Sequence, residues 1–117
     1  MISGLDALER LRAGNLRFAA NIHGPEELLT STRRAELTHV QEPLAIVLGC
    51  SDARVPAEIV FDQGLGDLFV IRVAGNIVAP SQVGSVEFAA SKFGTRLVVV
   101  MGHTKCGAIA AALDDVL

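Results

Sequence analysis

The sequence contains no tryptophan, no tyrosine and no cluster of basic residues. Phenylalanine occurs only five times in 117 residues although half of the chain is hydrophobic, so the core is expected to be aliphatic, as in a buried parallel sheet. The net charge of −3 offers no electrostatic surface for nucleic acid or for an anionic membrane. We therefore expect neither nucleic acid nor a membrane among its partners.

Long apolar runs are also missing. The longest, at residues 97–101, has the length of a strand and is far too short for a transmembrane helix. The first residues carry Asp6, Glu9 and Arg10 among their leucines, so they lack the apolar core of a signal peptide. These features predict a soluble cytoplasmic protein, and the length predicts a single domain over residues 1–117.

Cysteine is scarce, with Cys50 and Cys106 as the two examples. In a reducing compartment, such a pair favours metal binding or catalysis over a structural disulfide. Composition alone leaves a disulfide between them as the alternative.

The first 43 residues are predicted to form a helical arm. Ser3 and Asp6 resemble a capping box, and leucines then recur near helical spacing, which predicts an amphipathic helix over residues 4–20. Its apolar face is predicted to contain Leu5, Leu8, Leu11 and Leu16. A second, weaker helix is predicted over residues 26–40, bounded by Pro43.

Residues 44–117 are predicted to form the core of an α/β fold. Three short apolar runs predict strands buried on both faces: Leu44–Leu48, Leu68–Val73 and Leu97–Met101. Pro56 begins a short helix through Val60, and a longer helix ends at Gly94. The face of that longer helix is marked by Val83, Val86, Ala90 and Phe93. The β-α-β-α-β order predicts a parallel β-sheet with crossover helices, preceded by the N-terminal helices.

Candidate metal ligands follow two of these strands directly. Cys50 comes after the first strand, and His103 and Cys106 come after the third. Ligands of open parallel sheets gather at the carboxyl ends of the strands, so these side chains converge if the two strands are neighbours. Zinc accepts two thiolates and one imidazole, and it then keeps a fourth position for water. The alternative is a buried cysteine that packs as a small apolar residue beside an unrelated histidine.

Asp52 and Arg54 lie just beyond Cys50 with one residue between them. In an extended segment such side chains share a side, so carboxylate and guanidinium can pair beside the metal. Standing alone, the pair would be an ordinary surface ion pair. Next to a ligand cysteine, Asp52 could instead bind zinc in the fourth position, or accept a hydrogen bond from zinc-bound water while Arg54 holds it.

Two segments carry a resemblance to a known family: Cys-Ser-Asp-Ala-Arg-Val-Pro at residues 50–56 and Gly-His-Thr-Lys-Cys-Gly at residues 102–107. Together with residues 61–64, 72–76 and 86–88, they resemble the signature segments of the β-class carbonic anhydrases. The resemblance implies that Cys50, His103 and Cys106 hold Zn²⁺ and that Asp52 and Arg54 form a catalytic dyad. It further implies substrate-pocket positions for Gln41, Phe69, Ala74, Phe88 and Gly107, with Gln41 reaching across a dimer interface.

The implied activity is the reversible hydration of carbon dioxide to bicarbonate by a zinc-bound hydroxide, in a homodimer or a higher homo-oligomer. Zinc lowers the pKa of its bound water toward neutrality, and thiolate ligands make that effect weaker, so the Asp52 carboxylate gains importance. Two alternatives stay open. The chain could be a catalytically inactive, zinc-stabilised interaction module, or it could hydrolyse a carbon dioxide analogue such as carbon disulfide.

The sequence departs from the family pattern at two places. Family members usually continue well past the segment that ends this sequence, so we expect an uncovered sheet edge and uncovered apolar helix faces, whether the chain is a fragment, a natural truncation or one half of an exchanged dimer. Val47 occupies a position where some members have a tryptophan that belongs to a regulatory bicarbonate site. This favours the non-regulated subtype, with water on zinc.

Overall fold

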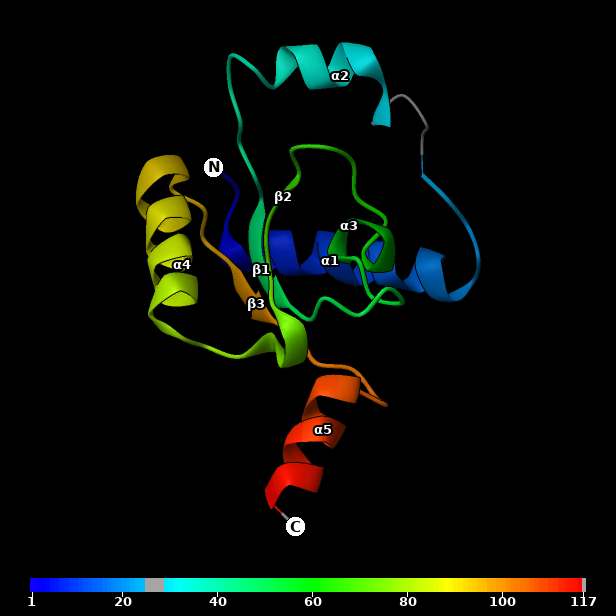
Figure 1. Ribbon diagram of the computed structural model, residues 1–117. Helices are drawn as coiled ribbons and strands as arrows, with labels where there is room; N and C mark the ends of the chain where they lie inside the picture. Colours follow the sequence, from blue (N-terminus) through cyan, green and yellow to red (C-terminus); the bar gives the residue numbers. More distant parts are fainter. Residues whose placement is uncertain (25–28, 117) are drawn as a thin grey trace.

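The computed structural model describes residues 1–24 and 29–116 and contains a three-stranded parallel sheet (Figure 1). Its strands are β1 (Ala45–Gly49), β2 (Leu68–Arg72) and β3 (Val98–Val100), in the order β2-β1-β3. The α/β class is confirmed, and the first and third strands are neighbours, which is the condition for convergence of the candidate ligands. The register pairs Gly49 with Arg72 and Leu48 with Val100, so the carboxyl ends of all three strands lie at one edge.

Helices cover both faces of this sheet. The helices of the described residues are α1 (Gly4–Ala19), α2 (Ser31–Glu36), α3 (Ala57–Val60), α4 (Pro80–Phe93) and α5 (Gly107–Val116), with a 3-10 turn, η2, at Ala74–Asn76. α4 lies on one side of the sheet and α1 with α3 on the other, while α5 extends beyond the carboxyl ends of the strands (Figure 1). Among the described residues, no helix is long and apolar enough to cross a membrane.

Only the central strand is buried on both faces. Every residue of β1 is buried, whereas β2 is mostly half-buried and β3 exposes Val98 and Val100. The prediction of double burial is therefore wrong for β2 and β3, which are the edge strands of the described sheet. In the described sheet β3 has one open side, and α5 contributes no buried residue.

The predicted first helix is present, but its buried face differs from the prediction. The Ser3 hydroxyl accepts a hydrogen bond from the Asp6 backbone N–H at 3.1 Å, as the capping box predicted. Leu11 is buried, together with Ala7 and Gly14, whereas Leu5 and Leu16 are 77% and 72% exposed. At about 100° per residue, Leu5 and Leu16 lie about 120° or more from Leu11 around the helix, so one flat surface cannot cover all three.

Close contacts fix α1 to the turn that follows α3. The backbone at Gly14 lies so near the carbonyl oxygen of Phe61 that a β-carbon would clash with it. Arg17 Nε donates to Asp62 Oδ2 at 2.6 Å, and the backbone N–H of Gly24 donates to Asp62 Oδ1 at 2.9 Å. Asp62 thus holds both α1 and the segment after it.

Two further helix predictions need correction. The second helix, predicted over residues 26–40, is confined to α2, and its predicted start lies outside the described residues. α4 ends at Gly94 in a left-handed conformation, φ 67°, as predicted, but its buried residue is Ala89. Val83 and Ala90, which were assigned to the apolar face, are exposed because the sheet lies on the side of the helix centred near Ala89.

Candidate metal centre

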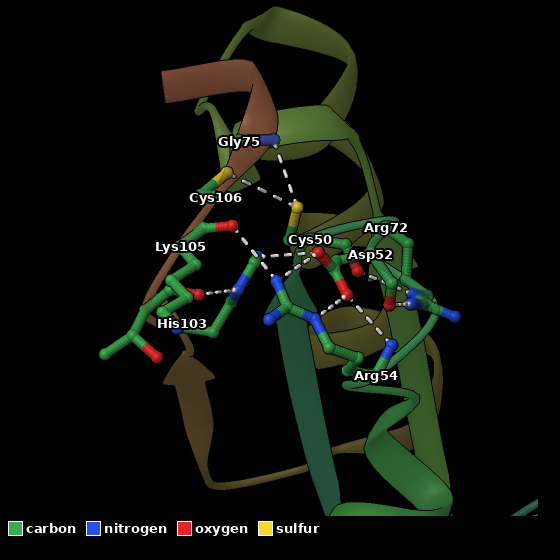
Figure 2. A network of polar contacts seen from close by, with 9 residues as sticks. Cys50, Asp52, Arg54, Arg72, Gly75, His103, Lys105 and Cys106 are labelled. Atoms are coloured by element: carbon green, nitrogen blue, oxygen red, sulfur yellow. Dashed lines mark hydrogen bonds and ion pairs between the residues drawn. The ribbon is translucent and has the colours of Figure 1, made fainter. Parts of the chain in front are cut away.

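Cys50, His103 and Cys106 converge at the carboxyl edge of the sheet (Figure 2). Cys50 follows β1 and the other two lie in the loop between β3 and α5, and their ligand atoms all lie within 4.8 Å of one another. The two Sγ atoms are 3.9 Å apart and both cysteines are free, so Cys50 and Cys106 do not form the alternative disulfide in this structure. The predicted convergence follows from the pairing of β1 with β3.

The His103 ring presents one nitrogen to this cluster. Its Nδ1 lies 2.8 Å from the Thr104 carbonyl oxygen, which can only accept, so Nδ1 carries the proton and donates. Nε2 is buried and has no hydrogen-bond partner among the described residues. A buried polar atom without a partner is destabilising, and a metal ion at the cluster would provide the partner.

The surroundings of Cys50 favour its thiolate form. Interaction with His103, followed by the backbone N–H groups of Asp52 and Gly75, lowers the pKa of the Cys50 thiol to about 6. The pKa of His103 is raised in turn, chiefly by Cys50. The thiolate is the ligand form of cysteine, and a set of two sulfurs and one imidazole suits zinc. The residues present therefore fit this metal.

The predicted pair of Asp52 and Arg54 is formed beside the cluster (Figure 2). Arg54 Nε donates to Asp52 Oδ1 at 2.9 Å and Arg54 Nη2 donates to Oδ2 at 2.8 Å. These bonds hold the pKa of the Asp52 carboxyl far below its usual range and raise that of Arg54. Asp52 Oδ2 also lies 4.0 Å from His103 Nε2. The carboxylate thus faces the cluster but is already bound at both oxygens.

The sequence patterns assign no individual role to three residues near the cluster, which are Arg72, Gly75 and Lys105. Arg72 donates to the carbonyl oxygens of Cys50 and Asp52, and the backbone N–H of Gly75 donates to Cys50 Sγ at 3.3 Å. Arg54 Nη2 additionally donates to the carbonyl oxygen of Lys105 at 3.0 Å. A signal existed for Arg72 and Gly75, because both lie in residues 72–76, one of the segments that carry the resemblance, and Gly75 has the positive φ, 74°, that glycine adopts readily.

Several predicted pocket residues lie away from the cluster in this chain. Phe69 pairs with Ile46, four residues before Cys50, and its ring contacts those of Phe88 and Phe93 at centroid distances of 6.0 and 5.9 Å. Gln41 precedes β1, whereas Cys50 follows it. Nearer the cluster are Ala74, which begins η2, and Gly107, which begins α5 directly after Cys106. The substrate-binding roles of these residues stay predictions.

Comparison with known proteins identifies the family. A family profile described as "Carbonic anhydrase" matches residues 45–116, which include the complete cluster. The chain belongs to the β-class carbonic anhydrases. Cys50, His103 and Cys106 form a cluster typical of the zinc site of this family.

Relatives of known sequence and structure agree with this assignment. The carbonic anhydrase of Mycolicibacterium smegmatis is 47% identical over 110 residues, which cover 92% of this chain and 52% of the relative. The β-carbonic anhydrase CafA of Aspergillus fumigatus has a TM-score of 0.64 and 33% identity, covering 91% of this chain and 50% of that one. A tetrameric β-carbonic anhydrase of Sordaria macrospora has a TM-score of 0.64 and 34% identity, covering 68% and 42%. The chain spans about half the length of the curated relatives it matches.

Proposed function

We propose that this chain holds one zinc ion through Cys50, His103 and Cys106 and catalyses the reversible hydration of carbon dioxide to bicarbonate. The observation that carries the proposal is the convergence of these three ligand atoms within 4.8 Å of one another. Zinc in such a donor set supplies Lewis acidity, which makes hydroxide available near neutral pH for attack on an electrophilic carbon.

The residues around the cluster have separate tasks in this proposal. His103 keeps its proton on Nδ1, which leaves Nε2 free to bind metal. Asp52 stays ionised because Arg54 binds both of its oxygens, so it can accept a hydrogen bond but cannot donate one. We assign to Asp52 the orientation of the hydroxyl group that attacks carbon dioxide.

The Asp52–Arg54 pair also bears on the fourth metal position. A carboxylate engaged by a guanidinium at both oxygens is less available as a metal ligand, which favours water in that position. Val47 is completely buried within β1, and it occupies the position at which regulated family members carry tryptophan. Both observations support the non-regulated subtype, and a role for Asp52 as a ligand stays the alternative prediction.

A metal analysis and a hydration assay on the same preparations test the proposal. Zinc-loaded wild-type chain is expected to contain one zinc per chain and to hydrate carbon dioxide in a stopped-flow assay. His103→Ala removes one of three ligands, so zinc content and activity should both fall to background. His39→Ala, an exposed histidine outside the cluster, is the matched control and should retain both.

The same preparations separate the alternatives. A wild-type chain that binds zinc but hydrates no carbon dioxide would refute the enzyme and support the inactive interaction module. Turnover of carbon disulfide without turnover of carbon dioxide would support the hydrolase. Full zinc content in His103→Ala would refute the ligand assignment.

We also propose that residues 1–117 act as one domain in a homodimer or a higher homo-oligomer. Support for one domain comes from Ala7 and Leu11 of α1, which pack in the same buried cluster as β1, α3 and β2. A location in the cytoplasm stays a prediction from the sequence.

A further inference from the structure

Arg72 is the last residue of β2, and the register of the sheet sets it directly opposite Gly49, the last residue of β1. The chain beyond Gly49 carries Cys50 and then Asp52. The Arg72 side chain therefore starts beside the segment that bears both the first ligand and the carboxylate (Figure 2).

The guanidinium of Arg72 binds two carbonyl groups of that segment. Its Nε donates to the carbonyl oxygen of Cys50 at 2.7 Å, and its Nη2 donates to that of Asp52 at 2.6 Å. The distances are short for N–H···O bonds, as expected for a charged donor. Because the two donors belong to one rigid plane, they fix the separation of the two carbonyl groups and hence the course of the backbone from Cys50 to Asp52.

The residues after Arg72 bind the same segment. The backbone N–H of Val73 donates to the Gly49 carbonyl oxygen at 3.1 Å, and that of Gly75 donates to Cys50 Sγ. The Cys50 side chain is therefore held at its sulfur by Gly75 and at its backbone by Arg72. Asp52 is also held at two places, because Arg54 binds its carboxylate and Arg72 binds its backbone carbonyl group.

We propose that Arg72 is a positioning residue, which fixes the backbone of residues 50–52 and thereby sets the placement of the Cys50 thiol relative to the Asp52 carboxylate. In this segment, Arg72 hydrogen-bonds to backbone oxygens and not to the Cys50 thiol or the Asp52 carboxylate. It therefore acts on the reaction indirectly, through the positions of Cys50 and Asp52. Its importance for hydration rests on the proposed function, whereas its effect on metal binding does not.

Cobalt(II) titration of the metal-free chain of residues 1–117 tests the proposal, since cobalt–thiolate absorption reports the geometry of the site. Arg72→Ala is expected to weaken cobalt affinity by about 10–100-fold and to change the spectrum, as loss of a group that orients a ligand does. Arg72→Lys should recover little of this, because one ammonium group cannot span both carbonyl oxygens in the fixed geometry of a fork. Arg96→Ala, at an exposed arginine outside the site, should behave as wild type.

Circular dichroism and thermal unfolding of each variant show whether it has folded. If Arg72→Ala does not fold, Arg72→Lys and Arg72→Gln take its place in the titration. Folded variants with wild-type cobalt affinity and a wild-type spectrum would overturn the proposal. This holds even if those variants have lost thermal stability. Hydration is measured separately, so a wild-type chain that binds cobalt but does not hydrate carbon dioxide when loaded with zinc would refute the enzyme and leave the test of Arg72 valid.

Discussion

Arg54 connects the two loops that carry the cluster. It binds both carboxylate oxygens of Asp52, in the loop after β1, and the carbonyl oxygen of Lys105, in the loop after β3. Lys105 itself has a positive φ of 56°, an uncommon conformation for lysine that the fixed carbonyl helps to maintain. A single guanidinium therefore controls the carboxylate and stabilises the loop between His103 and Cys106.

Replacement of Arg54 by alanine should separate metal binding from turnover. Without the guanidinium, the Asp52 carboxylate is free to rotate toward the metal and to occupy its fourth position. We expect Arg54→Ala to retain zinc but to lose hydration activity, by about 10–100-fold. Metal analysis and stopped-flow hydration of the same sample measure the two quantities.

Arg54→Lys should lie between alanine and wild type, because lysine restores the charge but not the two parallel hydrogen bonds. Arg96→Ala again provides the control with an unchanged site. Wild-type activity in Arg54→Ala would remove the Asp52–Arg54 pair from the mechanism.

Among the secondary-structure elements, α1 depends on a small number of specific contacts. Asp62 binds Arg17 of α1 and the backbone of Gly24 through its two oxygens, and the Arg17 hydrogen bond is the main reason that the pKa of Asp62 is lowered. Asp62 itself has a φ of 48°, which asparagine tolerates as readily as aspartate. Asp62→Asn therefore removes the charge without altering the backbone preference.

This contact should make stability depend on acid pH. Since the pKa of Asp62 is lower in the folded chain than in the unfolded one, its stabilisation is complete above the unfolded value of about 3.9 and is lost as pH falls through the folded value. At pH 6 we expect metal-free wild type to be more stable than metal-free Asp62→Asn by about 1 kcal/mol, because the ion pair is partly exposed. The difference should shrink below pH 4.

Urea unfolding of the two metal-free chains at several pH values measures this difference. Asp114→Asn, in α5, is the matched control for loss of a carboxylate away from α1. A stability difference between wild type and Asp62→Asn that stays constant from pH 6 to pH 3 would contradict the assignment.

For the whole molecule, the exposed apolar surface bears on assembly. Val98 and Val100 of β3 and Ile109 and Leu113 of α5 are each about half exposed or more. α1 adds Leu5 and Leu16, which point away from the core of this chain. Burial of such residues favours association by about 25 cal/mol per Å² of apolar surface, and two-fold pairing is the commonest arrangement of soluble homo-oligomers.

The position of Gln41 leads to the same expectation. Gln41 precedes β1 and Cys50 follows it, so the strand itself, about 16 Å long, separates the two within one chain. A role for Gln41 at the metal centre therefore requires a second copy. We expect a homodimer, or a multiple of it, by light scattering, with Gln41→Ala weakening turnover while zinc content stays intact.

Glu42→Gln, at the exposed neighbouring residue, is the control for a change in the same segment. An active monomer would refute a pocket shared between two chains. Wild-type turnover in Gln41→Ala would remove Gln41 from the site.

Local patterns in the sequence were sufficient for the strands and for the five central site residues. Apolar runs predicted β1, β2 and β3 to within two residues at each end, because burial selects apolar side chains locally. The positions of Cys50, His103 and Cys106 after β1 and β3 predicted their convergence, and the spacing of Asp52 and Arg54 predicted their pairing. Each of these predictions depends on neighbours in sequence and on the general rule that parallel strands end at one edge.

Only the tertiary structure decided which faces are buried and which side chains hold the site. The spacing of leucines in α1 was compatible with more than one face, and contact with Phe61 at Gly14 selected the side that contains Leu11. Arg72 reaches Cys50 because the register of β2 on β1 aligns it with Gly49, which no local pattern encodes. Such pairings depend on residues more than twenty positions apart, so they are fixed by packing of the whole sheet and not by the sequence around either partner.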